Sequence, residues 1–218
     1  MKIGGDDEMV NRFLAVGELS ECAIQFYRTH IKVRLSLEVN HQVITMQQTI
    51  SRKWNAEQYQ ELCRTIPCLH PRIDGIVTKG EHERIYTMPQ ADSPTRLMVS
   101  GNINEWRGRI YFNAQYIRPE PRAPDGMTIE LDGQWVDNKR LVNVIGDYPR
   151  AFSLDAPIGY ERRVYRLRLC YSSGYVERDG MVDDAVYGLQ ILSCHPLDEY
   201  IGDEQMKKIL LELEIMED

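Results

Sequence analysis

The chain has 218 residues, of which 43% are hydrophobic and 27% are charged, a composition that excludes disordered and fibrous proteins and is typical of a folded globular one. The net charge is −7, but residues 177–218 alone hold twelve Asp or Glu against three Lys or Arg. The total charge therefore does not exclude a nucleic-acid partner, because the distribution of charge matters more than its sum.

The start of the chain and its hydropathy indicate where the protein works. Residues 1–8 have neither the basic start nor the apolar run of a signal peptide. No stretch approaches the roughly 20 consecutive apolar residues of a membrane span. We therefore expect a cytoplasmic protein that does not contact a membrane.

Five cysteines occur, an odd number in a chain too long to need disulfide bonds for stability, so reduced thiols are expected. Cys63, Cys68 and His70 stand close together, and Cys194-His195 follows far downstream. Zinc sites are identified by paired C-x2-C knuckles, which this spacing lacks. We therefore predict no metal and no cofactor, with the cysteines as buried thiols.

The first regular elements follow from periodicity. Residues 31–39 alternate apolar and polar side chains, which predicts a half-buried strand, and residues 42–50 predict a second one. A helix is predicted over residues 55–66, because Asn55 begins a capping-box pattern and Pro67 ends the run. Its apolar residues fall on one face, so the helix should dock against the strands.

More strands are predicted after this helix. Residues 72–79 and 83–88 have strand composition. Residues 97–104 and 109–117 form the best hairpin candidate, joined by a four-residue turn at 105–108 that contains glycine. The second hairpin strand has an apolar side and a polar-aromatic side, so one can face a core and the other a ligand.

A domain boundary is predicted at residues 119–126, within a stretch that holds three prolines. It separates a first domain, residues 1–118, from a second one, residues 127–218. The second domain is again rich in β-structure and is predicted to be barrel-like. Its strands are predicted at residues 127–136, 141–146, 163–171 and 187–193.

The end of the chain permits two interpretations. Residues 209–215 alternate like a strand. Met206, Ile209, Leu210 and Leu213 instead make a helical stripe. The pattern alone leaves both structures open.

Motifs of the common enzyme classes are absent, including the P-loop, the dinucleotide-binding glycines and the nucleophile elbow. Asp125 followed by Glu130 and Asp132 resembles the start of a nuclease motif, but that chemistry needs a lysine where Asp132 stands. A turn before a strand explains these acids equally well. We therefore predict a protein that is not an enzyme.

Aromatic and basic residues share the same strands. Stacking of bases on aromatic rings, together with arginine contacts to phosphate, is how single strands are bound without sequence readout. In the hairpin the candidates are Trp106, Arg107, Arg109, Tyr111, Tyr116 and Arg118. Arg166 and Arg168 share one face of a later strand. For any one of these arginines, a solvated strand face or an ion pair with an acid is the alternative.

The stretch from Val99 to Phe112 resembles the last two strands of an OB-fold. It contains a V-x-G strand, a short loop and a second strand that begins Gly108-Arg109-Ile110-Tyr111. The resemblance covers about residues 12–118 and implies a mainly β fold. It predicts an OB-like Greek-key barrel with one docked helix, followed by a second small β-rich domain.

In size and acidity the chain resembles the OB-fold single-stranded-DNA-binding proteins of phages and mobile elements. That family joins a basic binding face to an acidic C-terminal segment, which contacts replication and repair proteins. The resemblance implies such a partner-binding role for Glu212, Glu214, Glu217 and Asp218. Unlike the family's tail, this segment is rich in leucine and isoleucine and has no Gly- and Pro-rich spacer.

We therefore predict non-catalytic binding of single-stranded DNA or RNA in replication or recombination. The alternative is a structural or assembly protein of a phage or mobile element, whose β-domains pack in a homo-oligomer. In that case the exposed aromatics anchor a protein interface. Direct measurement of nucleic-acid binding separates the two hypotheses.

Overall fold

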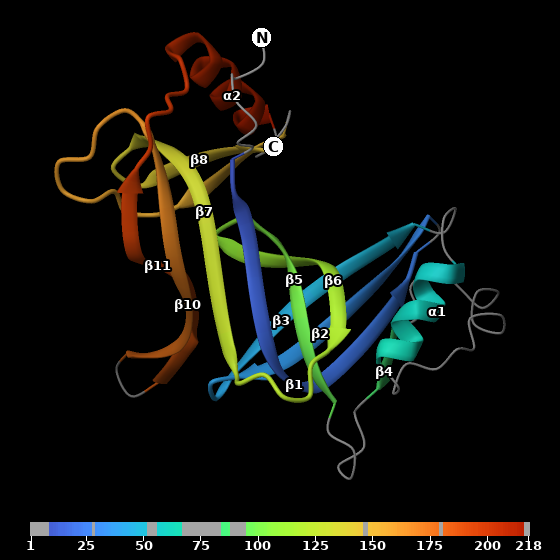
Figure 1. Ribbon diagram of the computed structural model, residues 1–218. Coiled ribbons are helices and arrows are strands. Elements are labelled where there is room, and N and C mark those ends of the chain that lie inside the picture. The colour runs from blue at the N-terminus through green and yellow to red at the C-terminus, as the bar shows by residue number, and fades with distance from the viewer. Residues whose placement is uncertain are drawn as a thin grey trace. The chain divides into compact units, whose positions relative to one another are not determined.

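The computed structural model describes residues 9–27, 29–51, 56–66, 84–87, 95–145, 148–178 and 181–215 (Figure 1). Strands dominate this part of the chain, which confirms the predicted mainly β class. In chain order the elements are β1 (Asn11–Phe26), β2 (His30–Val39), β3 (Gln42–Ser51), α1 (Ala56–Thr65), β4 (Arg84–Thr87), β5 (Arg96–Trp106), β6 (Arg109–Pro119), β7 (Gly126–Asp137), β8 (Arg140–Ile145), β9 (Tyr148–Ser153), β10 (Val164–Arg178), β11 (Met181–Pro196) and α2 (Asp203–Ile215).

The chain divides into two compact units. The barrel unit comprises Phe13–Asn102 and Tyr111–Met127. The C-terminal unit comprises Met1–Arg12, Ile103–Ile110 and Thr128–Asp218. The strands β1, β5, β6 and β7 therefore each contribute residues to both units.

Five strands of the barrel unit form a closed circle. β1 pairs with β2 and β2 with β3, all antiparallel, and β3 pairs with β6 in parallel. β6 neighbours β5, and β5 pairs with β1 to complete the circle. The helix α1 falls between the third and fourth barrel strands in sequence, as in the OB-fold, a five-stranded Greek-key barrel. The predicted OB-like barrel with one helix is confirmed; β4 is an added strand beside β1.

Alternating apolar side chains fill the barrel. Phe13 of β1 meets Phe112 of β6 edge to face, with 5.2 Å between ring centroids, and both rings are buried. At Gly101 the strands come so close that an added Cβ would lie 1.9 Å from the carbonyl oxygen of Asn113. Only glycine fits there, so the glycine of the V-x-G motif permits the close approach of β5 to β6.

Two tight turns shape the barrel hairpins. Asn40 and His41 between β2 and β3 have φ of 49° and 65°, and Arg107 and Gly108 between β5 and β6 have φ of 52° and 70°. Positive φ at both central residues defines the two-residue turn that suits the twist of paired strands. The predicted four-residue turn at 105–108 is therefore wrong, because the strands continue to Trp106 and resume at Arg109.

Of the other elements predicted in residues 31–79, three are confirmed and one lies outside the described residues. The strands at 31–39 and 42–50 are confirmed as β2 and β3, and the helix at 55–66 as α1. Leu62 on its docked face is buried. The predicted strand at 72–79 lies outside the described residues.

The C-terminal unit contains an antiparallel sheet in the order β9-β8-β7-β10-β11. Among its described residues no pairing joins β9 to β11, so this sheet is open and the expectation of a second barrel is wrong. Trp135 of β7 is buried and donates its ring N–H to the carbonyl of Leu154, at 2.9 Å. It also meets Tyr165 edge to face, which links β7 to β10.

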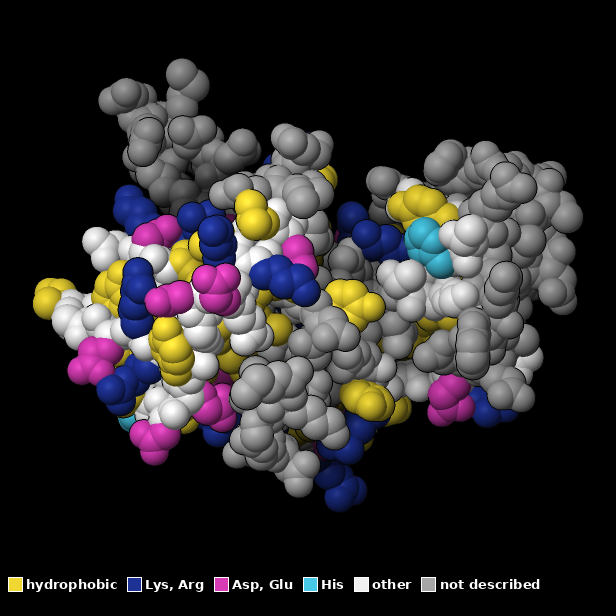
Figure 2. Space-filling model, turned by 90° about the horizontal axis from the view of Figure 1, so that it is seen from above, with side chains coloured by type: hydrophobic (Ala, Val, Ile, Leu, Met, Phe, Trp, Pro, Cys, Tyr) yellow, Lys and Arg dark blue, Asp and Glu magenta, His cyan; other side chains and the backbone are white. Residues whose placement is uncertain are grey.

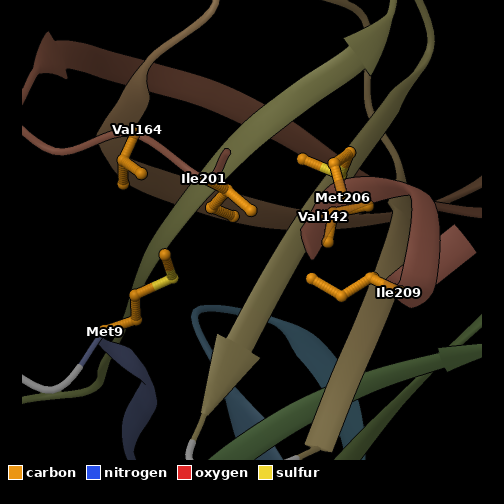
Figure 3. Close-up of a cluster of buried hydrophobic side chains, with 6 residues drawn as sticks. All are labelled: Met9, Val142, Val164, Ile201, Met206 and Ile209. Atoms are coloured by element: carbon orange, nitrogen blue, oxygen red, sulfur yellow. The ribbon is translucent and has the colours of Figure 1, made fainter. Parts of the chain in front are cut away.

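The end of the chain is a helix. Figure 3 shows Met206 and Ile209 of α2 directed at Val142 of β8. Met9, Val164 and Ile201 complete this cluster of buried side chains. Of the two interpretations of residues 204–218, the helical one is therefore correct as far as Ile215. The apolar stripe of this helix covers the core of the C-terminal unit. None of the described helices is long and apolar enough to cross a membrane.

Residues 119–126, the predicted linker, join β6 to β7. The Arg96 guanidinium donates to the carbonyl of Ala123 at 2.7 Å and pairs with Asp125. The backbone N–H of Glu120 donates to the carbonyl of Arg96 at 3.0 Å. The segment is thus tied to β5. The division into domains 1–118 and 127–218 concerns independent folding and stays a prediction.

Candidate nucleic-acid interface

The outer face of β2 and β3 presents polar side chains to solvent. The apolar residues of both strands point into the barrel, so the residues between them point outward. Lys32 and Arg34 of β2 lie opposite Thr49 and Gln47 of β3. Arg34 and Thr49 are exposed, and Lys32 is half-buried. This face therefore combines two neighbouring cations with hydrogen-bonding side chains.

A row of amides continues from these cations across the barrel. Gln47 lies opposite Asn113 of β6 and donates to its side-chain oxygen at 2.8 Å. The Asn113 amide in turn donates to the side-chain oxygen of Asn102 on β5, at 3.5 Å. With Arg34 the row spans four strands. We refer to Arg34, Gln47, Asn113 and Asn102 as the polar row.

The surroundings of Lys32, including Arg34, change its protonation. Burial, and secondarily the positive charge of Arg34, lower the pKa of Lys32. An anion placed between these side chains would relieve the repulsion and favour the charged lysine.

At the turn that precedes β2, the rings of Tyr27 and His30 are stacked, 4.4 Å apart and inclined by 14°. Figure 2 shows basic and acidic side chains interspersed on the face seen there.

The tip of the β5–β6 hairpin holds three predicted site residues in the C-terminal unit. Trp106 is 54% exposed, and the Arg107 guanidinium lies 4.4 Å from the centre of its ring. Arg109 is exposed. The Glu105 carboxylate accepts hydrogen bonds from the backbone N–H and the hydroxyl of Ser153, at 2.7 and 2.6 Å. This anchor holds the tip in place, with an aromatic ring and two cations at its surface.

The other predicted residues of β6 belong to the barrel unit. Tyr111 is half-buried, whereas Tyr116 is 73% exposed. Arg118 is exposed and lies 3.5 Å from the carboxylate of Glu120. Tyr116 and Arg118 line a pocket beside α1. The aromatic residues of the hairpin are therefore distributed along β6 and not gathered at its tip.

The two arginines predicted on β10 differ in their surroundings. Arg166 donates two hydrogen bonds of 2.9 Å to the carboxylate of Asp132, which is only 1% exposed. The same carboxylate accepts the backbone N–H of Val10 at 3.0 Å. Arg166 therefore neutralises a buried acid, as the ion-pair alternative expects. Arg168 is exposed and lies opposite Glu130 of β7.

The acids that resemble a nuclease motif are engaged in ion pairs. Asp125 pairs with Arg96, Glu130 with Arg12, and Asp132 with Arg166. In the part of the chain that the structure describes, no three His, Cys, Asp or Glu side chains gather to hold a metal ion. Of the weighed zinc ligands, Cys68 and His70 lie outside the described residues.

The acidic segment is partly helical. Glu212 lies on α2, 3.8 Å from the ammonium group of Lys208. Glu214 belongs to the same helix, and Glu217 and Asp218 lie outside the described residues. The segment is thus a packed helix as far as Ile215, and its partner-binding role stays a prediction.

The polar row is missing from the predicted site. The alternation of residues 31–39 places Arg34 on the outer face of its strand, so this residue could have been found in the sequence. Gln47 and Asn113 are 66 residues apart and meet only through the short parallel pairing of β3 with β6. No local pattern indicates that pairing.

The pairing of its strands makes the barrel unit an OB-like five-stranded barrel with a polar outer face. No family model matches the chain, and no curated protein matches it in sequence. Among solved structures, it is similar to a deletion mutant of the single-stranded DNA binding protein from Thermus aquaticus. The two are 10% identical with a TM-score of 0.46, and the match covers 90% of this chain and 98% of that one.

Proposed function

We propose that the chain binds single-stranded nucleic acid, without catalysis, on the outer face of the barrel. The observation that carries this proposal is the polar row beside Lys32, which begins on the second and third barrel strands, the pair that OB-folds use for oligonucleotides. Amide side chains can donate to and accept from the edges of unpaired bases, and the two cations suit phosphate. In a duplex those base edges are already paired.

The charge of the chain also favours a single strand over a duplex. Non-specific duplex binding depends almost wholly on neutralised phosphates. This chain has a net charge of −7, and its cations are few on the proposed face. Hydrogen bonding and stacking must therefore supply much of the affinity, and in a duplex the Watson–Crick edges are paired and the base faces are stacked.

In this proposal the hairpin tip makes a contact of its own. Trp106 supplies a stacking surface, and Arg107 and Arg109 contact phosphate. Arg168 is a further phosphate contact. Trp106→Ala should weaken binding of a single-stranded oligonucleotide by about 1–3 kcal/mol. Circular dichroism should show an unchanged fold, because about half of the ring surface is exposed to solvent. An affinity equal to that of the wild-type chain would mean that the hairpin tip does not contact the oligonucleotide.

The main test is a fluorescence-anisotropy titration with labelled single-stranded and double-stranded DNA at two salt concentrations. We expect the single strand to bind more tightly and to weaken with salt, by about −0.7 in log–log slope per phosphate neutralised. Arg34→Gln should weaken binding on the order of tenfold, since a charged contact in the polar row is lost. Arg122→Gln, also at an exposed arginine, is the control for charge.

Two results would contradict the proposal. One is an absence of single-strand binding even at low salt. The other is an equal loss of affinity in Arg34→Gln and Arg122→Gln. That result would mean that Arg34 acts only through the total charge of the protein and not through a contact with the strand. RNA oligonucleotides of the same sequence determine which nucleic acid is preferred. A role in replication or recombination is the setting we propose for such binding.

A second candidate function is protein assembly through the C-terminal unit. Large hydrophobic side chains are exposed on it, among them Tyr148, Ile158 and Leu192. Exposed apolar side chains are typical of contact surfaces between proteins. Light scattering over a range of concentrations tests for a homo-oligomer, and a monomer at all concentrations would count against it.

A further inference from the structure

A pocket of about 530 Å³ opens on the barrel unit between α1 and the strands β3, β5 and β6. Gln48, Leu62, Met98 and Tyr116 are among the residues that line it. Phe112, Ala114 and Tyr116 alternate to the same side of β6, and Phe112 lies in the barrel core. Gln115 and Ile117, on the Asn113 side of β6, also line the pocket, so it lies along the end of β6 that follows Asn113.

The walls of the pocket suit a flat ring. Tyr116 is 73% exposed, so one face of its ring can receive a stacked partner. Leu62 and Met98 add apolar surface. A volume of several hundred Å³ is within the range of small-ligand sites.

One polar atom of the pocket lacks a hydrogen-bond partner. The side-chain amide of Gln48 donates to the backbone carbonyl of Gln115, at 3.4 Å. Its side-chain oxygen is buried and accepts no hydrogen bond from the described residues. A buried acceptor without a donor costs free energy, so a ligand that supplies an N–H group gains that much in addition.

The charges at the pocket do not favour a phosphate. Arg118 lies 3.5 Å from Glu120, and Glu61 lies 3.3 Å from Arg64. Both Arg118 and Glu61 line the pocket, so it carries one charge of each sign, and each has a counter-ion. A neutral ring is therefore a better ligand than an anion.

We propose that this pocket takes one unstacked nucleobase of the bound strand, with its ring on Tyr116 and one of its N–H groups directed to the side-chain oxygen of Gln48. The proposal rests on the proposed function and adds to it a site for a base at the end of β6 that follows Asn113. Such a pocket would make the chain distinguish a strand with bases from a bare sugar-phosphate backbone.

The test compares two oligomers of equal length, one of deoxycytidine and one in which tetrahydrofuran replaces every base. The wild-type chain should prefer the deoxycytidine oligomer. Tyr116→Ala should weaken its binding on the order of tenfold and leave the tetrahydrofuran oligomer unaffected. Tyr116→Phe should retain binding, and Gln48→Leu should weaken only the base-bearing oligomer. Tyr148→Ala, at a tyrosine of similar exposure on the C-terminal unit, is the matched control.

The outcomes separate the two proposals. If Arg34→Gln weakens binding but Tyr116→Ala acts like Tyr148→Ala, the pocket is not a base site and the outer face remains. If Tyr116→Ala weakens both oligomers equally, the effect is structural and the pocket proposal fails. If the wild-type chain binds neither oligomer, both proposals fail.

Discussion

The carboxylate of Asp132 and the guanidinium of Arg166 form an ion pair in which one partner is buried and the other half-exposed, with side-chain exposures of 2% and 45%. The amide of Asn143 donates to the backbone carbonyl of Asp132 at 2.6 Å, and Asn11 donates to the side-chain oxygen of Asn143 at 3.3 Å. These bonds join β1, β7, β8 and β10 inside the C-terminal unit. A polar network of this kind tolerates the loss of a member poorly.

Asp132→Asn should therefore destabilise the chain by about 2–3 kcal/mol, because it leaves Arg166 without its counter-charge. Urea unfolding measures this change. The control is Glu130→Gln, which breaks the more exposed pair with Arg12 and should change the free energy of unfolding by less than about 1 kcal/mol. Equal changes in the free energy of unfolding for the two substitutions would mean that the buried network stabilises the chain no more than the exposed ion pair does.

Lys32 permits a test of the outer face by titration. Its pKa is lowered first by burial and then by the charge of Arg34, so the lysine loses its proton at a lower pH than an ordinary lysine does. Arg34→Gln should raise this pKa part of the way to its ordinary value, since burial remains. Bound single strand should also raise it, so the contribution of Lys32 to affinity should be complete below the pKa of the free protein and lost as pH rises through the pKa of the complex.

The measurement is nuclear magnetic resonance of the Lys32 side chain, labelled at its terminal carbon, with and without an oligonucleotide. A titration midpoint that the oligonucleotide leaves unchanged would show that no phosphate approaches Lys32. A midpoint that Arg34→Gln leaves unchanged would show that the two cations are independent.

At the scale of elements, the strands differ in how clearly their patterns appear. Apolar and polar residues alternate without interruption in β2, so the sequence predicts this strand clearly. β1 does not alternate clearly, because residues 13–16 are all apolar; its register with β2 also shifts between Leu19 and Glu21, and no strand was predicted there. β9 contains Pro149, which argues against a strand in a local analysis. In both cases pairing with a neighbouring strand overrides a local irregularity.

The helix α2 is stabilised by what it covers. Ile209 is buried in the core of the C-terminal unit, whereas Leu211 on the same helix is 54% exposed. Ile209→Ala should destabilise the chain by about 2–4 kcal/mol. Leu211→Ala should change the free energy of unfolding by less than about 0.5 kcal/mol. Urea unfolding of both variants is the measurement, and similar losses would mean that α2 is not docked through its stripe.

At the scale of the whole molecule, each compact unit is assembled from segments that are separated in the sequence. Residues 1–12 and 103–110 belong with residues 128–218, although they precede the proline-bearing segment at 119–126. Met9 contributes to the core cluster of the C-terminal unit, and Asn11 accepts the backbone N–H of Ile103 at 2.9 Å. A boundary located by prolines cannot detect contacts of this range.

The predicted domain 127–218 should therefore be unstable when expressed alone, because it lacks Met9, Asn11 and Ile103. We expect a broad thermal transition well below that of the full chain, measured by circular dichroism. A sharp transition at the temperature of the full chain would instead show that residues 127–218 fold independently.

The amino-acid sequence by itself determined the β class, most strands, the helix at 55–66 and the OB-like hairpin. These depend on side-chain periodicity and turn residues, which act over a few positions. Tertiary structure alone decided the close approach of β5 to β6 at Gly101, the helical state of residues 203–215, the ion pair of Arg166 and the polar row. Each depends on residues far apart in sequence, whose proximity follows from strand pairing and from the burial of apolar surface, and neither is visible in a local pattern.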